Sequence, residues 1–159
     1  MSDTLVTLTI VAAVGSGLVA GVFFAFSAFV MQALGALPPA RSIAAMQAIN
    51  RMAPTAWFMA AFLGTGLVSL VVGIAAIVRW GEAGATYQLI GSVLSVLPII
   101  ITAAYHVPRN DALDVVDPDN SDAARCWADY APGWTRWNHV RTVTPLAAAV
   151  LLTLAARVG

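Results

Sequence analysis

Long apolar runs alternate with shorter polar stretches along this chain. Four runs reach the roughly 20 apolar residues that an α-helix needs to cross the hydrocarbon core of a bilayer: residues 5–34, 54–78, 84–106 and 139–156. The first run carries no charged residue. The pattern therefore predicts an all-α fold, an integral membrane four-helix bundle that forms a single domain over residues 1–159.

The polar stretches between the runs are unequal. A tight turn near residues 80–82 joins the second run to the third, whereas residues 35–53 and 107–138 form two long loops. In an antiparallel bundle both long loops emerge at one membrane face and both termini at the other. Arginines crowd the long-loop face: Arg41, Arg51, Arg109, Arg125, Arg136 and Arg141, against Arg79 and Arg157 opposite. The positive-inside rule therefore predicts that the long loops are cytoplasmic.

The first long loop has the pattern of a short interfacial helix. Ile43, Met46 and Ile49 are spaced to share one helical face. Gln47 and Asn50 share another face. We expect this helix to lie across the mouth of the bundle.

The second long loop carries an aromatic stripe at helical spacing. Its members are Trp127, Tyr130, Trp134 and Trp137, and residues 132–133 (Pro-Gly) interrupt it. The stripe predicts a second interfacial helix over the mouth. It is also typical of an aromatic belt at the membrane interface, which needs no catalytic role.

Prolines mark several helix positions. Pro54 is expected in the first turn of the second span, where a missing N–H is harmless. The third span is expected to stop before Pro108, and Pro98 and Pro145 are expected to bend their helices.

Gly17 and Gly21 form a small-xxx-small pair in the first span. Such a pair permits close contact between membrane helices, although glycine is common in membrane spans and the spacing can arise by chance. The uncharged first span could also face a second copy, so a homo-oligomer is possible.

Composition narrows the class of protein further. The hydrophobic fraction is 60%, the charged fraction 10%, and the net charge zero, so the chain offers no field that attracts nucleic acid. The single Cys126 excludes an internal disulfide and a zinc site built from several cysteines. The start has Asp3 and no basic segment, so the first run is expected to be a retained membrane helix rather than a signal peptide.

Polar groups that could do chemistry gather at the long-loop face. His106 and His139 lie at the ends of neighbouring spans, and Asn138 and Arg141 share a helix face. Ionisable residues at membrane depth are functional candidates by default. The alternatives are structural: asparagine and histidine can cap helix ends, and arginine can extend to lipid headgroups.

A metal site has only weak support from the sequence. His106 and His139, with a carboxylate such as Asp111, could hold iron or copper. The metal-binding spacings His-x-x-x-His and Glu-x-x-His are absent. We therefore predict no metal and no cofactor, and keep iron or copper at the two histidines as the alternative.

Four segments combine in order into a recognisable pattern. They are residues 21–31 (GVFFAFSAFVM), 46–50 (MQAIN), 106–113 (HVPRNDAL) and 134–141 (WTRWNHVR). Together they resemble the DUF1772, or anthrone oxygenase-like, membrane family. The resemblance implies a four-helix membrane fold and kinship with fungal enzymes that oxidise anthrones to anthraquinones with dioxygen, without an added cofactor.

The resemblance also suggests which residues carry the function. The family often has Asn at the position of His106, which weakens that histidine as a shared base. The residues that carry over best are Asn110, Asn138, His139 and Arg141.

The leading hypothesis is a membrane oxygenase that deprotonates an apolar hydroxylated aromatic of the anthrone type for attack by dioxygen. His139 would be the base, and Arg141 with Asn138 would stabilise the oxyanion. The substrate-binding candidates are Gln47, Asn50, Phe23, Phe24, Phe26, His106, Trp134 and Trp137.

The alternative is a non-enzymatic module that binds a lipid, a quinone or a partner membrane complex. The sparse ionisable groups and the glycine pair favour it. A transporter is the weakest option, because the sequence has no midplane ion relay and no pair of broken helices.

Overall fold

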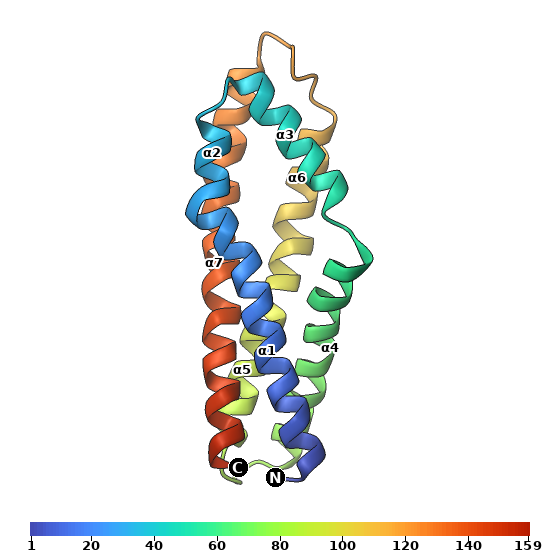
Figure 1. Ribbon diagram of the computed structural model, residues 1–159, viewed down its shortest axis with the longest axis vertical. Helices are drawn as coiled ribbons and strands as arrows, with labels where there is room; N and C mark the ends of the chain where they lie inside the picture. Colours follow the sequence, from blue (N-terminus) through green and yellow to red (C-terminus); the bar gives the residue numbers. More distant parts are fainter.

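The computed structural model describes residues 1–159 as four long antiparallel helical rods and one shorter helix (Figure 1). The rods are α1 (Asp3–Ala25) with the π-helical turn η1 (Phe26–Val30) and α2 (Met31–Gly35); α4 (Ala56–Val78); α5 (Ala85–Ile101) with the π-helical turn η2 (Thr102–His106) and α6 (Val107–Asp114); and α7 (Ala123–Val158). The shorter helix, α3 (Pro39–Met52), follows the first rod. The all-α membrane bundle expected from hydropathy is confirmed.

All four rods are long and apolar enough to cross a membrane. Exposed tryptophans mark both ends of α4: Trp57 is 88% exposed and Trp80 is 65% exposed. Between them the helix rises about 34 Å, close to the roughly 30 Å of a hydrocarbon core. Tryptophan favours both membrane interfaces, so these two residues fit a span that runs the full length of α4. The protein is a multi-pass membrane protein.

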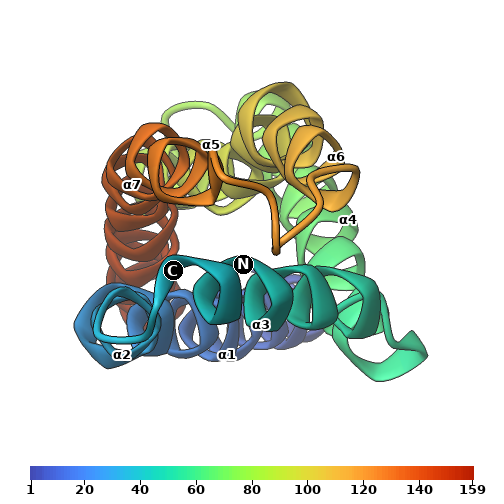
Figure 2. The same ribbon diagram turned by 90° about the horizontal axis from the view of Figure 1, so that it is seen from above.

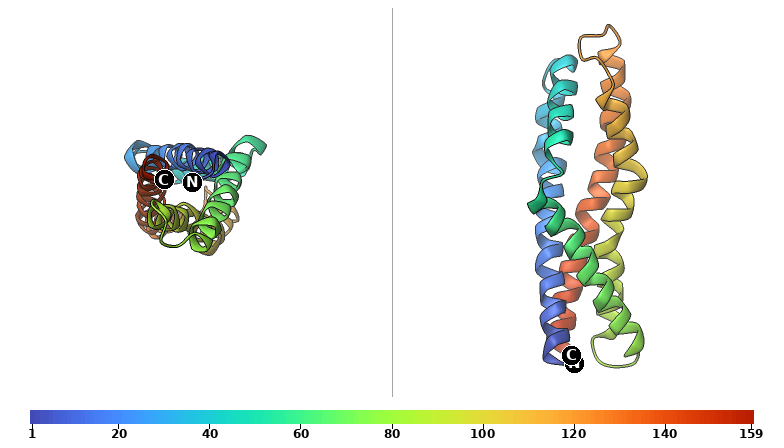
Figure 3. Two further views of the ribbon diagram at one scale, coloured as in Figure 1. Left: turned by 90° about the horizontal axis from the view of Figure 1, so that it is seen from below. Right: turned by 90° about the vertical axis from the view of Figure 1, so that its right-hand side faces the viewer.

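The rods stand at the corners of a square, in the cyclic order α1, α4, α5 and α7 (Figure 3, left). Both termini and residues 79–84 lie at one end of the bundle, and α3 and residues 115–122 lie at the other (Figure 1). Seen from above, α3 extends from the end of α2 over α1 toward α4, and it faces α6 and α7 (Figure 2). We call this end, with α3, the loop end.

Two helices differ from the sequence-based expectation near proline. Thr55 caps α4 by accepting a hydrogen bond from the Phe58 amide, so Pro54 precedes the helix instead of occupying its first turn. The third rod does not stop before Pro108 but continues to Asp114. Pro108 is tolerated because it falls in the first turn of α6, directly after a π-helical turn, where its missing N–H costs little.

The fourth rod also begins much earlier than expected. α7 has 36 residues, about 54 Å of helix, and it runs without a break through residues 132–133. The aromatic stripe is therefore not a separate interfacial helix. It is the first half of the rod that becomes the last span.

Most of the aromatic stripe is buried core and not an interfacial belt. Trp127, Tyr130 and Trp134 pack in one apolar cluster with Ile43 and Met46 of α3. In the same cluster lie Met31, Leu34, Leu113 and Ala123. The cluster holds α3 over the bundle, as the Ile43 and Met46 spacing predicted.

Close helix contact in the first span occurs at a glycine other than the expected pair. A Cβ atom at Gly15 would collide with the Thr65 side chain of α4. Gly17 has only Ala149 at the edge of contact, and Gly21 has no neighbour. Of the two interpretations of Gly17 and Gly21, chance spacing fits their surroundings within the bundle, and the close contact of the first span is made at Gly15.

Hydroxyl groups connect the rods further down the bundle. The Ser95 hydroxyl of α5 lies 2.9 Å from that of Ser16 and accepts a hydrogen bond from Ser69 at 2.8 Å. Interhelical hydrogen bonds of this kind are worth roughly 0.6 kcal/mol each in a membrane. They fix the register of α1, α4 and α5 below the loop end.

Candidate active site

A large cavity lies among the rods at the loop end, and we call it the loop-end cavity. Its volume is about 800 Å³, within the roughly 300–1,000 Å³ range of small-molecule sites. The lining residues are Val22, Phe23, Phe26, Ile49, Asn50, Arg51, Met52, Ala53, Pro54, Phe58, Met59, Phe62, Leu63, Ile99, Thr102, Ala103, Val107, Asn110, Asp111, Asp114, Trp134 and Arg141. Because 14 of these 22 residues are hydrophobic, the cavity suits a mainly apolar ligand.

Aromatic rings form one wall of the cavity. Phe23 of α1 meets Phe62 of α4 edge to face, with ring centroids 5.7 Å apart. Phe58 stacks on Phe62 at 5.6 Å, and Phe26 packs against Trp134 at 5.6 Å. Such surfaces favour stacking or edge contact with a flat ring system.

Arg141 brings a positive charge into this apolar site. Its side chain is buried, with the residue only 4% exposed. Its guanidinium carbon lies 4.3 Å from the centroid of the Phe23 ring and 5.2 Å from that of Trp134. Both rings attract a cation through their faces, so the charge is held between aromatic surfaces.

The partners of the Arg141 guanidinium are all neutral. One terminal nitrogen donates to the Thr102 hydroxyl at 3.0 Å, and the other donates to the Asn138 carbonyl oxygen at 2.8 Å. The Nε atom has no partner. The ion pairs of the protein are Arg51–Asp114, Arg79–Glu82 and Arg125–Asp122, so Arg141 has no carboxylate partner.

The charge lies within the membrane-spanning part of the bundle. Arg141 covers the ring of Phe23, which contacts Phe62 in the second turn of α4. That turn is about 9 Å along the helix from its start. At this depth an uncompensated charge is costly, and such residues are usually functional.

Asn138 is fully buried and holds Arg141 in place. Its amide nitrogen donates to the Phe23 carbonyl oxygen and to the Ser27 hydroxyl, both at 2.8 Å. Its carbonyl oxygen accepts from Arg141. Asn138 does not line the cavity, so it acts as a positioning residue for the guanidinium.

Two asparagines line the cavity nearer the loop end. The Asn110 carbonyl oxygen accepts hydrogen bonds from the Tyr130 hydroxyl at 2.8 Å and from the Trp134 indole at 3.0 Å. These bonds orient the Asn110 amide group. Asn50 of α3 also lines the cavity, and its buried amide nitrogen has no partner. It is a donor available to a ligand.

The aqueous rim of the cavity carries charged side chains. Arg51 of α3 and Asp114 of α6 form an ion pair at 2.8 Å. Asp111 also lines the cavity, but it makes neither an ion pair nor a hydrogen bond with another side chain. The cavity lining therefore offers one paired and one free carboxylate.

One flank of the cavity opens toward lipid. Leu63 of α4 and Val107 of α6 line the cavity although they are 50% and 45% exposed, and the lining residue Ala103 is exposed as well. The flank lies between α4 and α6, which have different neighbours. α4 packs on α1 and α5, whereas α6 packs on α3 and α7. Figure 3 (right) faces this side of the bundle, where α4 leans across it.

Three of the expected site residues face away from the cavity. His139 is exposed and has no hydrogen bond, because it follows Asn138 by one residue and is turned about 100° from that inward face. Phe24 is exposed for the same reason, next to the inward Phe23. Trp137 lies at the outer surface and packs on Tyr105 at 5.5 Å. The structure does not bring these three residues to the site.

Two further expected residues are buried but do not line the cavity. Gln47 donates to the carbonyl oxygens of Leu113 and Val116 at 2.9 and 2.8 Å, and so ties α3 to the end of α6. The His106 Nε2 atom lies 3.3 Å from the Trp134 carbonyl oxygen, and its Nδ1 atom has no partner. His106 supports the Trp134 wall from behind.

The protein contains no group of three or more His, Cys, Asp or Glu side chains arranged to hold a metal ion. His106 is in the interior whereas His139 is on the outer surface. Of the two histidines that the iron or copper alternative needs, one is therefore enclosed by protein and the other faces outward.

Two polar residues of the site were missed by sequence reasoning. Thr102 and Ser27 lie inside apolar spans, yet they accept hydrogen bonds from Arg141 and Asn138. Both belong to the π-helical turns η2 and η1. Such turns are frequent at functional sites, and their placement beside α7 could not be read from hydropathy.

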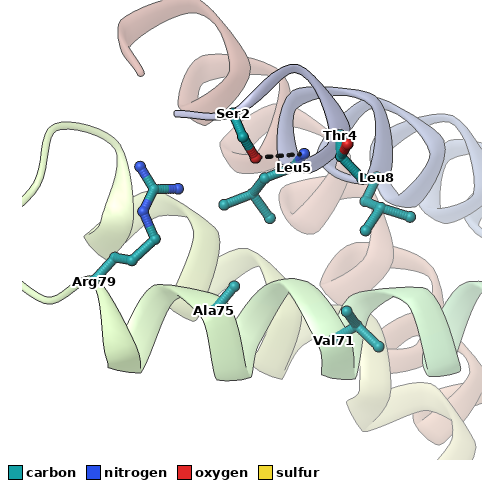
Figure 4. Close-up of a pocket in the computed structure, with 7 residues that line it drawn as sticks. All are labelled: Ser2, Thr4, Leu5, Leu8, Val71, Ala75 and Arg79. Carbon is teal, nitrogen blue, oxygen red and sulfur yellow. Dashed lines mark hydrogen bonds between the residues drawn. The ribbon is translucent and has the colours of Figure 1, made fainter.

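A second, smaller cavity of about 410 Å³ lies at the opposite end, between α1 and α4 (Figure 4). It is lined by Ser2, Thr4, Leu5, Leu8, Val71, Ala75 and Arg79. Its cation is already paired, because Arg79 donates to Glu82 and lowers the pKa of that carboxyl. An uncompensated charge distinguishes the loop-end cavity from this one.

Comparison with known proteins adds the family. No curated protein and no solved structure shows a significant match to the chain. The family model described as anthrone oxygenase matches residues 55–151, which is more than half of the chain. The matched region includes Asn110, Trp134, Asn138 and Arg141. The chain therefore belongs to the anthrone oxygenase family.

Proposed function

We propose that this protein is a membrane-embedded oxygenase that acts on a flat, apolar, hydroxylated aromatic of the anthrone type and binds it as an anion. One observation carries the proposal: the buried guanidinium of Arg141 lines an apolar cavity and has no carboxylate partner. An anionic oxygen of the substrate supplies the missing partner.

The energetic argument is one of compensation. Burying an unpaired charge costs several kcal/mol after relaxation, and neutral partners such as Thr102 and Asn138 offset only part of that cost. A substrate anion that enters the cavity gains more from Arg141 than a neutral molecule does. The site thus favours the deprotonated form of the substrate.

The chemistry follows from that preference. Loss of a proton from the ring methylene of an anthrone places negative charge on the carbonyl oxygen, beside Arg141. The electron-rich ring carbon then reacts with dioxygen. One oxygen atom ends in the new carbonyl group of the anthraquinone, and the other leaves as water. The substrate anion supplies the electrons, so we propose that no bound cofactor takes part.

Replacement of Arg141 tests this function. Arg141→Met is expected to lower the rate of anthraquinone formation from anthrone at least about 100-fold, as loss of an oxyanion-stabilising group does. Dioxygen uptake and anthraquinone absorbance of the purified protein in lipid nanodiscs measure the rate. Arg136→Met is the control on the same helix, and it should keep the rate within about threefold. Equal rates for Arg141→Met and the wild type would refute the function.

Binding of a quinone or lipid without turnover is the second candidate function. The open flank at Leu63 and Val107 favours it, since lipid-soluble molecules of either kind reach the cavity there. A wild-type protein that binds anthraquinone through Arg141 but consumes no dioxygen with anthrones would support this candidate over the oxygenase.

We also propose that the loop end faces the cytoplasm. Six of the eight arginines lie in or beside the two long loops of that end, and a positive excess favours the cytoplasmic side. Arg141 is buried in the site, so five arginines remain to support the orientation.

A further inference from the structure

We infer that Asp111 is the general base that removes the proton from the substrate carbon. The inference rests on the proposed function, because it names the group that completes the reaction at the same cavity. It replaces His139 in that role, since His139 is on the outer surface.

The cavity lining offers two carboxylates, and only one of them is free. Asp111 and Asp114 both line it. Asp114 is held by Arg51 at 2.8 Å, so its carboxylate already has a partner. Asp111 makes no ion pair and no side-chain hydrogen bond, so it is available to a ligand.

Other possible bases near the cavity are occupied or turned away. The Tyr130 hydroxyl donates its proton to Asn110. His106 does not line the cavity, and its Nε2 atom lies against the Trp134 carbonyl oxygen. A proton acceptor must reach the reacting C–H directly or through one water. Asp111 lines the cavity and has no partner, so it is the carboxylate free to take this role.

Asp111 and Arg141 mark opposite ends of the site. Arg141 is bonded to Thr102, and Asp111 lies nine residues further along the same rod, about 13 Å by helical rise. Thr102, Val107 and Asp111 all line the cavity. In a tricyclic substrate with its carbonyl oxygen at Arg141, the methylene lies across the central ring on the side of Asp111, and a water molecule between them relays its proton to the carboxylate.

The proton transfer is balanced within the site. The C–H bond breaks, the proton moves to an Asp111 carboxylate oxygen, and the electron pair moves into the ring to give an enolate. Negative charge thereby leaves the rim and appears on the oxygen beside Arg141. The attraction between opposite charges is stronger in the apolar interior than at the rim, so Arg141 offsets part of the free-energy cost of forming the enolate.

Hydrogen–deuterium exchange of the anthrone methylene under anaerobic conditions tests the base. The wild type in nanodiscs prepared with D₂O should accelerate the exchange, which NMR follows without any need for oxidation. Asp111→Asn should lose at least about 100-fold of that acceleration, the usual contribution of a general base. Asp111→Glu should restore a large part of it. Asp129→Asn, at an exposed position of α7 outside the cavity lining, is the matched control and should stay within about threefold of the wild type.

Anthraquinone, which has no methylene proton, separates the role of a base from that of a binding group. Asp111→Asn should bind it as tightly as the wild type does, by quenching of tryptophan fluorescence. Loss of that binding, or exchange by Asp111→Asn at the wild-type rate, would overturn the assignment. Oxidation by the wild type without catalysed exchange would also overturn it, while the proposed function would stand. A wild type that catalyses neither the exchange nor the oxidation would overturn both the proposed function and the assignment of the base.

Discussion

At the scale of single residues, the site depends on Asn138 and Arg141. Their spacing predicts from sequence that they share a helix face, and the structure joins them by a 2.8 Å hydrogen bond. The same spacing excludes His139 from that face, because one residue of an α-helix turns the side chain by about 100°. The missing carboxylate partner of Arg141 could not be predicted, since it depends on which spans meet.

The outward position of His139 leads to a direct prediction. His139→Ala should keep the rate of anthrone oxidation within about threefold of the wild type, because the exposed ring touches nothing in the cavity. Steady-state dioxygen uptake measures this. A loss of two orders of magnitude would return His139 to the role of base and contradict the orientation of α7.

Removal of the Asn138 side chain should affect both stability and rate. Asn138→Ala deletes hydrogen bonds to Phe23, Ser27 and Arg141. At roughly 0.6 kcal/mol for each interhelical bond, with a cavity contribution added, we expect a loss of about 2–3 kcal/mol. Reversible unfolding in mixed micelles measures it. Thr153→Ala, at an exposed position of the same helix, should change stability by less than about 0.5 kcal/mol.

At the scale of helices, the two π-helical turns shape the site. η1 and η2 lie on different rods, and each presents a hydroxyl group to α7 through Ser27 or Thr102. A π-helical turn adds a residue to the turn and so changes which side chains face inward beyond it. Hydropathy located the rods but not these turns, because both helix types give the same apolar run.

Glycine positions in α1 give a test of helix packing. Gly15→Leu should destabilise the bundle by about 1–3 kcal/mol, since its side chain would collide with Thr65 and force α1 from α4. Thermal unfolding in detergent measures the loss. Gly21→Leu is the matched control at a position with open space. Equal destabilisation by both substitutions would argue against the close approach at Gly15.

At the scale of the whole molecule, the sequence predicted the four spans and the position of α3 across the mouth of the bundle. Long apolar runs and the Ile43 and Met46 spacing carry that information directly. The sequence did not predict that two rods continue through Pro108 and Pro132. A proline can end a helix or be accommodated inside it, and the neighbouring packing decides which occurs. The sequence predicted a site at the loop end, and Asn50, Phe23 and Trp134 do line the cavity. The shape of the cavity depends on the long rods and could not be predicted.

The orientation of the bundle can be measured with single cysteines. In a Cys126→Ala background, Ser121→Cys lies at the loop end and Glu82→Cys lies at the opposite turn, both exposed. A membrane-impermeant maleimide added to intact cells should label Glu82→Cys and leave Ser121→Cys unlabelled until the cells are permeabilised. The reverse pattern would place the loop end outside.

The open flank at Leu63, Ala103 and Val107 has a consequence for kinetics. A molecule that arrives through this flank is drawn from the hydrocarbon phase, so its mole fraction among the surrounding amphiphiles sets the rate of encounter. Addition of empty vesicles or extra detergent dilutes that phase and slows the reaction even when the total amount of substrate in the tube is constant. An apparent KM therefore scales with the quantity of lipid present.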